Sequence, residues 1–437
     1  MRLKIVLWFA VVGFNALSGI VGTQILPSAD RYVRLLTGGG DLMMITLAVV
    51  SIFPHRSFYG VRLLGAFLVS AFITVVVNVD ALGLVAQLSA LRQPLFLFSA
   101  LIVAYDIFQS PHRERFLRWF TAFLVVFALA QIPTSVLQFI QFGPGDEVGG
   151  TYGLRGGSGY VTQVLFLIVF FLLTRYGSLH EGMRFSLTKL LVFSVLLVPC
   201  FLNETKISFV LLPAFLLLML ETRRIYRLVP FLLFGGLLLY GLYSYYDHAV
   251  GGARVLLDER FLERYLLYDR RQNVDIPRFQ KIFLMFQLFG KNIWSAIVGM
   301  GYGLFAGGHL IEATRLSRTL AYFGGSRGLV LTLWMQGGVI ALGIVISTIF
   351  MFLRPLGSLT STVRRFALYV AFSLVAMLFY NEAMLDRTFA ALVSVMMVWV
   401  YTSGRDAEEE PPGDDDLFPD EQAEHPVADA YATSSDH

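Results

Sequence analysis

The stretch VLFLIVFFLL at residues 164–173 decides the fold class, because it is apolar on every face. The same is true of KISFVLLPAFLLLML at residues 206–220. A strand of a membrane barrel would instead alternate apolar and polar residues over about ten positions. A bilayer core about 30 Å thick is crossed by a helix of about 20 apolar residues. Uniformly apolar runs of this kind therefore predict transmembrane helices.

Similar runs recur along nearly all of the 437 residues, of which 56% are hydrophobic and only 15% are charged. This composition lies far outside the balance of soluble globular proteins. The fold class that we predict is all-α, a polytopic membrane bundle of about twelve helices. The first run, which follows MRLK, is expected to remain as a helix and not to be removed as a signal peptide. The expected spans are residues 5–22, 36–53, 61–78, 82–105, 116–141, 159–176, 188–203, 206–220, 228–246, 328–353, 365–381 and 386–402.

Basic residues are distributed unevenly between the two sets of connections that alternate along these spans. One set of helix flanks carries 17 Lys and Arg residues, whereas the other carries five when its single long loop is left out. Cytoplasmic loops of membrane proteins are the ones with excess Lys and Arg. We therefore predict that both termini are cytoplasmic. The second set of connections, which includes Arg155, Lys206 and Arg387, is then on the outer face.

Four regions follow from this arrangement. Residues 1–246 hold helices one to nine, 247–327 form a large outer loop, 328–403 hold helices ten to twelve, and 404–437 form an acidic, disordered cytoplasmic tail. The loop contains 11 Lys and Arg residues against 7 Asp and Glu, and the tail contains 12 acidic residues and one Arg. The basic excess of the loop either binds an anionic partner or forms a solvated surface.

Within the loop, DIPRFQKIFLMFQLFG at residues 275–290 predicts a helix that opens with Asp and Pro and stops at Gly290. Arg278 then falls in the first turn, where the helix dipole disfavours a cation. An anionic ligand would be held there by the side chain and by free backbone N–H groups together. The motifs GMGYG at 299–303 and GGSRG at 324–328 are either phosphate-binding turns or simple loop turns.

Several polar residues fall in or beside the apolar spans, where a charge is costly unless it is paired or used. Arg92 is expected near the middle of the fourth span, where it either lines a groove for a lipid carrier or marks a span made of two shorter pieces. The other polar and charged residues lie in two short outer turns, with Asn203, Glu204 and Lys206 in one and Glu382, Asp386 and Arg387 in the other. The charges of each turn either form ion pairs within that turn or have a binding or catalytic role.

Arg155 stands in YGLRGGSGY at 152–160, immediately before the sixth span and on the predicted outer face. Further along, Arg278 opens the loop helix that precedes the glycine motif at 299–303. A last loop segment then runs into LVLTLWMQGGVIALGIV at 329–345. This order of features, with one large outer loop between the ninth and tenth spans, resembles the O-antigen ligase and polymerase superfamily.

The resemblance implies an inverting glycosyltransferase that needs no metal or other cofactor. It implies a location in the bacterial inner membrane, with the active site facing the periplasm. The implied partners are an undecaprenyl-diphosphate-linked oligosaccharide, the lipid bilayer, and a flippase and a chain-length regulator of the same pathway, but no nucleic acid. A polymerase would join repeat units to one another, whereas a ligase would transfer the glycan to lipid A core sugars.

The resemblance also implies roles for individual residues. It places Arg155 and Arg278 on the diphosphate of the donor. Ligases carry a histidine base just before the tenth span, but this sequence has Arg327 near that position, which favours a polymerase over a ligase. The residues themselves, and not the resemblance, provide the other candidates. Glu204 and His309, which lies earlier in the loop, are the candidates for the acceptor base. The substrate-binding candidates are Arg92, Asn203, Lys206 and Arg315.

Arginine suits this chemistry independently of any resemblance. Its planar fork forms paired, charge-assisted hydrogen bonds to phosphate oxygens and stays protonated, so it can stabilise a departing diphosphate without a metal. We therefore predict that Arg155, Arg278 and Arg327 together form a clamp for the diphosphate. The competing function classes are a flippase or other transporter and a structural scaffold. Transporters often have two related halves with a midplane site, and the sequence has no convincing repeat. A scaffold would leave the outer arginines unexplained.

The predicted orientation can be tested with single cysteines in a Cys200→Ala background, because Cys200 is the only cysteine of the chain. In intact cells, an impermeant maleimide should label Asn273→Cys in the loop and should not label Ser434→Cys in the tail until the membrane is permeabilised. The reverse pattern would place the loop arginines in the cytoplasm and would contradict the orientation.

Overall fold

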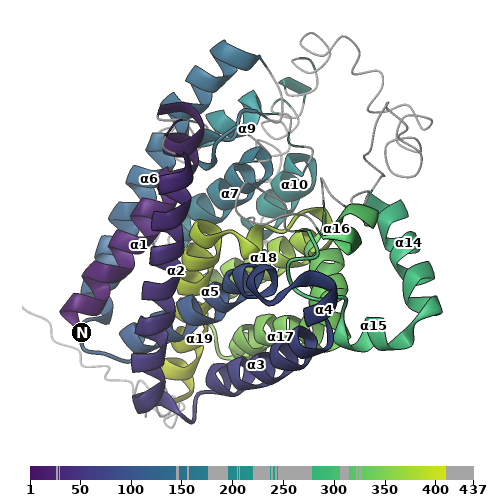
Figure 1. The fold of residues 1–437 in the computed structure, drawn as a ribbon. Coiled ribbons are helices and arrows are strands. Elements are labelled where there is room, and N and C mark those ends of the chain that lie inside the picture. Colours follow the sequence, from purple (N-terminus) through teal and green to yellow (C-terminus); the bar gives the residue numbers. More distant parts are fainter. Residues whose placement is uncertain are drawn as a thin grey trace, which may run out of the picture.

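The computed structural model describes residues 1–25, 28, 30–143, 147–154, 157–175, 195–203, 205, 207–219, 237, 240–241, 244, 278–305, 314–320, 323 and 327–409. The regular elements of these residues are helices (Figure 1). The α-helices are α1 (Arg2–Ile20), α2 (Asp30–Ile52), α3 (Tyr59–Val77), α4 (Val79–Leu82), α5 (Leu84–Phe108), α6 (Arg113–Phe142), α7 (Gly157–Arg175), α9 (Val198–Leu202), α10 (Ser208–Met219), α14 (Arg278–Lys291), α15 (Ile293–Val298), α16 (Arg315–Thr319), α17 (Leu329–Leu353), α18 (Ser361–Tyr380) and α19 (Arg387–Glu409).

In the described part of the chain, eight helices are long and apolar enough to cross a membrane by length and composition. They are α1, α2, α3, α5, α6, α7, α17 and α18, and each matches a predicted span. The prediction of an all-α membrane bundle is confirmed at this level. The count of twelve stays a prediction. The described residues of the seventh and eighth spans form the short helices α9 and α10, and most of the ninth span lies outside the described residues.

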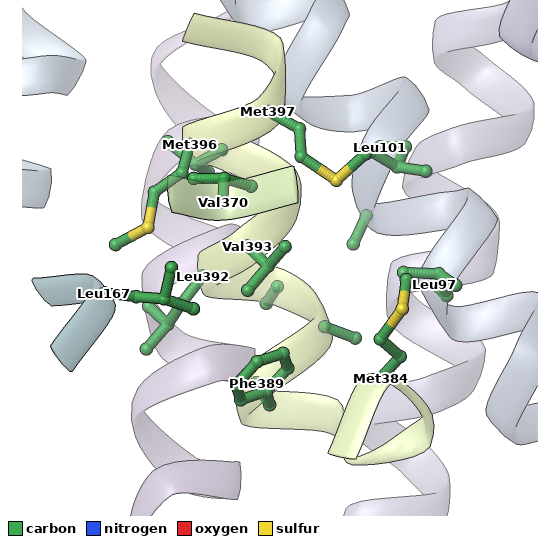
Figure 2. Packing of buried hydrophobic residues seen from close by; sticks show 14 of the residues in the cluster. Leu97, Leu101, Leu167, Val370, Met384, Phe389, Leu392, Val393, Met396 and Met397 are labelled. Carbon is green, nitrogen blue, oxygen red and sulfur yellow. The ribbon is translucent and has the colours of Figure 1, made fainter. Parts of the chain in front are cut away.

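Helix α19 lies inside the bundle. Every residue from Thr388 to Val400 is buried. A helix that is buried on all sides in this way is one that is apolar all round. Figure 2 shows the packing of this helix: Leu97 and Leu101 of α5, Leu167 of α7 and Val370 of α18 lie around Phe389, Leu392, Val393, Met396 and Met397 of α19. Helix α19 is therefore the common neighbour of helices that are far apart in the sequence.

Helix α19 also runs past the boundary predicted at residue 403 and ends at Glu409. The extension is held by an ion pair between Asp406 and Arg113 at 2.5 Å and by two hydrogen bonds. The Arg405 guanidinium donates to the Tyr105 hydroxyl at 3.3 Å, and the Ser358 hydroxyl donates to the Gly404 carbonyl at 3.0 Å. The start of the chain lies at the same end of the bundle, because the Lys4 ammonium binds the Asp106 carboxylate at 2.7 Å. We call this end the Asp106 end and the opposite one the Arg327 end.

Helix α17 is broken at Gly338, whose φ of 74° is not helical. The break frees backbone carbonyls of the preceding turn, which must find donors elsewhere. The donors are backbone N–H groups of the loop: Met300 donates to the Met335 carbonyl at 2.7 Å, and Gly301 donates to the Gln336 carbonyl at 3.1 Å. The glycine motif at 299–303 therefore acts as a structural insert, and these two amides are not free to bind phosphate.

Further hydrogen bonds fasten this part of the loop to the bundle. They run from the Thr74 hydroxyl to the Val298 carbonyl at 2.7 Å, from the Asn78 amide to the Gly299 carbonyl at 3.3 Å, and from the Trp334 indole to the Ala296 carbonyl at 2.9 Å. Glycine is required at 299, 301 and 303 because each has a positive φ and closely approaches a neighbouring element. Helices α14 and α15 are consequently attached to α3 and α17 (Figure 1).

Gly338→Ala should destabilise this junction. The new Cβ would collide with the Ile297 carbonyl oxygen, and an L residue at positive φ costs about 1–2 kcal/mol by itself. We expect a lower melting temperature of the detergent-solubilised protein. Gly343→Ala is the matched control on the same helix, because a Cβ there meets no atom within 4 Å and alanine favours helix. Equal melting temperatures for the two variants would contradict the account.

Candidate functional site

Arg327 lies directly before α17, whose N-cap is Gly328. Its guanidinium donates to the Glu382 carboxylate at 2.9 Å, and the Thr332 hydroxyl donates to the other oxygen of the same carboxylate at 2.9 Å. The guanidinium also lies 4.3 Å from the centre of the Phe305 ring, a cation–π contact. Arg327 is therefore held in one place by three elements. Glu382 is the partner that sequence reasoning did not assign.

A second charged cluster surrounds Asp41 of α2, whose side chain is fully buried. The Arg387 guanidinium donates two hydrogen bonds to this carboxylate, one of them at 2.9 Å, and an Arg92 guanidinium nitrogen lies 3.6 Å from it. A buried charge is tolerated only when it is paired in this way. Pairing of Asp386 with Arg387 within their turn was one of the two alternatives from the sequence, whereas the ion pair that the structure gives Arg387 is with Asp41. A lone aspartate in an apolar span is the signal that could have identified it.

Arg92 belongs to one continuous helix, since α5 runs through Pro94 to Phe108. The alternative of two shorter pieces for the fourth span is therefore wrong for the region around Arg92. The chain does break earlier, at Gly83, which has a φ of 75° and separates α4 from α5. The Arg92 side chain is 34% exposed, so part of its guanidinium remains accessible beside Asp41.

The start of α7 abuts the turn between α18 and α19. The Tyr152 and Tyr160 rings meet edge to face at 5.9 Å, and Tyr160 lies within electrostatic range of Glu382, Asp386 and Arg327. A Cβ at Gly159 would lie 3.1 Å from the Asn381 amide nitrogen. Residues on either side of Arg155 therefore lie beside the Arg327–Glu382 pair. Arg155 itself lies outside the described residues.

The loop that leads to Arg155 is clasped by two buried glutamines of α6. Gln131 donates to the Thr151 hydroxyl at 2.8 Å and accepts from the Thr151 backbone N–H at 2.9 Å. Gln138 does the same for the backbone of Gly150, donating to its carbonyl at 2.8 Å and accepting from its N–H at 2.6 Å. The two side chains bind the backbone as a neighbouring strand would. The residues directly before YGLRGGSGY are therefore fixed to α6.

The first turn of α14 also reaches this end of the bundle. The backbone of Arg278 begins the helix, as predicted, but its side chain lies outside the described residues. One turn later, the buried Lys281 lines a small cavity together with Gly328 and Phe379. Lys281 is a second cation of this helix that sequence reasoning passed over as part of an amphipathic pattern.

The other predicted site residues are placed unevenly. Asn203 is buried and links α9 to α7, because its amide donates to the Thr162 hydroxyl at 3.0 Å and to the Ser158 carbonyl at 3.2 Å. Arg315 begins the short helix α16 and is exposed. Glu204, Lys206 and His309 lie outside the described residues, so nothing is known of their positions.

Burial shapes the ionisation of two groups at this end. It raises the pKa of Tyr152 well above the usual range, and the nearby Asp386 and Tyr160 raise it further. The enclosed position of Asp386 raises the pKa of its carboxyl group, while hydrogen bonds from the backbone of Phe389 and the charge of Arg387 oppose the shift. Tyr152 is therefore a neutral hydrogen-bond donor at physiological pH.

Comparison with protein-family models gives no match to this chain, and comparison with curated protein sequences gives none either. Arg327 with Glu382, Arg92 and Arg387 with Asp41, and the first turn of α14 all lie toward one end of the bundle. Such an arrangement can bind an anionic group beside a neutral polar one.

The Asp41 cluster should be essential for the stability of this end. Asp41→Ala leaves two arginines without their buried partner, which typically costs about 3–5 kcal/mol. Asp80→Ala, at an exposed carboxylate on α4, should cost far less. Both effects are measurable as denaturation midpoints in detergent.

A double variant tests the pairing itself. Asp41→Ala with Arg387→Met removes both members of the closest ion pair, and its cost should be smaller than the sum of the two single variants. Strict additivity would show that Asp41 and Arg387 stabilise the protein independently of each other.

Proposed function

We propose that the chain is a membrane glycosyltransferase that uses an undecaprenyl-diphosphate-linked oligosaccharide as its donor and joins repeat units of a surface polysaccharide. The observation that carries the proposal is the convergence of three elements. These are the fixed Arg327, the clasped loop that precedes Arg155, and the first turn of α14, which begins with Arg278. In the sequence, Arg155 lies more than a hundred residues before Arg278 and Arg327, and helix α14 separates Arg278 from Arg327.

The arginines would stabilise charge that grows on the leaving diphosphate. The C–O bond between the anomeric carbon of the donor sugar and the diphosphate breaks as an acceptor hydroxyl attacks from the opposite face, which inverts the configuration. Preorganised cations are most effective for this purpose, because they are not rearranged during the reaction. Arg327 fits this requirement, since Glu382, Thr332 and Phe305 already fix the neighbourhood of its guanidinium.

The proton of the acceptor hydroxyl needs a base. Glu204 and His309 remain the candidates for this role in the proposal. The absence of a histidine at the position of Arg327 favours repeat-unit polymerisation over transfer to lipid A core. The reaction would take place on the periplasmic face of the inner membrane, as the charge distribution of the connections predicts.

Substitution of the three arginines tests the proposal. Arg155→Ala, Arg278→Ala and Arg327→Ala should each lower the rate at which reconstituted protein lengthens lipid-linked repeat units, by roughly 100-fold or more, as removal of a charge-stabilising donor does in other enzymes. Lys291→Ala, at an exposed cation in the last turn of α14, is the matched control and should keep full activity.

The same vesicles separate the competing functions. Repeat units that change leaflet without lengthening would indicate a flippase, and transfer to lipid A core without lengthening would indicate a ligase. Full activity of the three arginine variants would contradict the proposed diphosphate clamp. Repeat units that remain unchanged with the unmodified protein would contradict the enzymatic proposal itself.

A further inference from the structure

Gln163 of α7 is a buried polar residue for which the described part of the chain provides no partner. Its side chain is 1% exposed, and neither its amide nitrogen nor its amide oxygen has a hydrogen-bond partner among the described residues. An amide buried without partners is costly, so such a residue needs an explanation. The proposed function leaves Gln163 unused.

The polar residue next to Gln163 on the same helix is, in contrast, satisfied by the protein itself. Thr162, the preceding residue, is buried and is paired with Asn203, which also binds the Ser158 carbonyl. These bonds join α7 to the neighbouring α9. Gln163 makes no such link between the described helices, so a role in packing does not account for it.

Gln163 lies on the face of α7 that is turned toward the Arg327–Glu382 pair. Residues three and four apart share a helix face, so Gln163 lies on the same face of α7 as Gly159 and Tyr160, one turn further along the helix. A Cβ added at Gly159 would lie 3.1 Å from the Asn381 amide nitrogen, so this face of α7 is turned toward Asn381. Tyr160 is within electrostatic range of Glu382 and Arg327.

Two other groups at this place lack partners in the described structure. The Asn381 amide nitrogen and the Tyr152 hydroxyl are both buried atoms without a hydrogen bond among the described residues. Asn381 uses its amide oxygen to accept from the Ala383 backbone N–H at 3.2 Å, so only its donor remains. Tyr152 packs edge to face on Tyr160. Donors, an acceptor and aromatic rings thus occur together.

This combination matches a sugar ring. Hydroxyl groups both donate and accept hydrogen bonds, so they suit an amide that offers both, and the apolar face of the ring suits an aromatic side chain. A phosphate would accept only and would leave the Gln163 oxygen unpaired. A lipid tail would leave all of these polar atoms unpaired.

We propose that Gln163, Asn381 and Tyr152 form the subsite for the sugar that is attached to the diphosphate of the donor, beside Arg327. This inference deepens the proposed function and rests on it for the identity of the donor. It assigns the diphosphate and the sugar to different residues, which makes the two parts of the site separable by experiment.

Binding of two fluorescent lipids to the full-length protein in nanodiscs tests the subsite. The first is the lipid-linked oligosaccharide, and the second is undecaprenyl diphosphate without sugar. Gln163→Leu and Asn381→Leu should each weaken binding of the first roughly tenfold, the usual effect of losing one well-placed hydrogen bond, and should leave binding of the second unchanged. Tyr152→Phe removes only a hydroxyl and should act in the same direction. Thr162→Val is the control and should affect neither lipid.

Stability supplies an independent readout for the same variants. If Gln163 serves a ligand, Gln163→Leu replaces an unpartnered amide by an apolar group of similar size, and the ligand-free protein should melt at a higher temperature. A lower melting temperature would indicate a structural role and would overturn the inference. Equal binding of the lipid-linked oligosaccharide to the unmodified protein and to both leucine variants would overturn it as well.

The outcomes also separate this inference from the proposed function. The leucine variants could bind the sugar-bearing lipid more weakly while the unmodified protein fails to lengthen repeat units. This result would support the sugar subsite and contradict the proposed enzymatic function. Lengthening by the unmodified protein, with no effect of the leucine variants on binding, would keep the enzyme and reject the subsite.

Discussion

Polar groups in the interior of this bundle have to be satisfied by other groups of the protein, since a hydrocarbon surrounding offers them none. Three places show the consequence. The carbonyls freed by Gly338 bind amides of the loop, the backbone of Gly150 and Thr151 binds two glutamines of α6, and the carboxylate of Asp41 binds Arg387. Each solution joins segments that are far apart in the chain, so the same requirement that stabilises the bundle also fixes its connections.

This requirement explains how loop residues can be positioned for chemistry. The segment 299–303 completes the hydrogen bonding of α17 and is therefore an integral part of the bundle. Helix α14 is connected to that segment through α15, and its first turn lies near Gly328. Arg327 lies directly before α17 at the same junction, and its guanidinium is bound to Glu382 of the turn between α18 and α19. The guanidinium of an arginine held in this way keeps its position. A group that stabilises a developing charge has to be preorganised in this sense.

The cluster around Asp106 and the group around Gln163 differ in how their buried polar atoms are paired. Around Asp106, the carboxylate accepts from Lys4 at 2.7 Å and from Ser51 at 3.0 Å, and His55 lies 2.9 Å from its second oxygen. These contacts close the cluster and tie α1, α2 and α5 together. At the Arg327 end, by contrast, Gln163 and the Asn381 nitrogen are enclosed but have no partner among the described residues. A closed cluster is typical of a structural tie, whereas enclosed groups without partners require an explanation, which the proposed sugar subsite supplies for Gln163 and Asn381.

The all-α fold, the position of eight spans and the start of α17 follow from the sequence alone, because apolar length and helix boundaries are local properties of the chain. The sequence also singled out Arg92 and Arg327. It did not reveal that Asp41 pairs with Arg92 or that Glu382 pairs with Arg327. Nor did it reveal that Arg387 pairs with Asp41, which lies 346 residues away, because these groups meet only when the helices pack. The break in α17 was equally hidden, because two glycines in an apolar run also occur where helices simply pack closely. Only the tertiary structure decides which polar groups meet, because that depends on how the helices pack side by side.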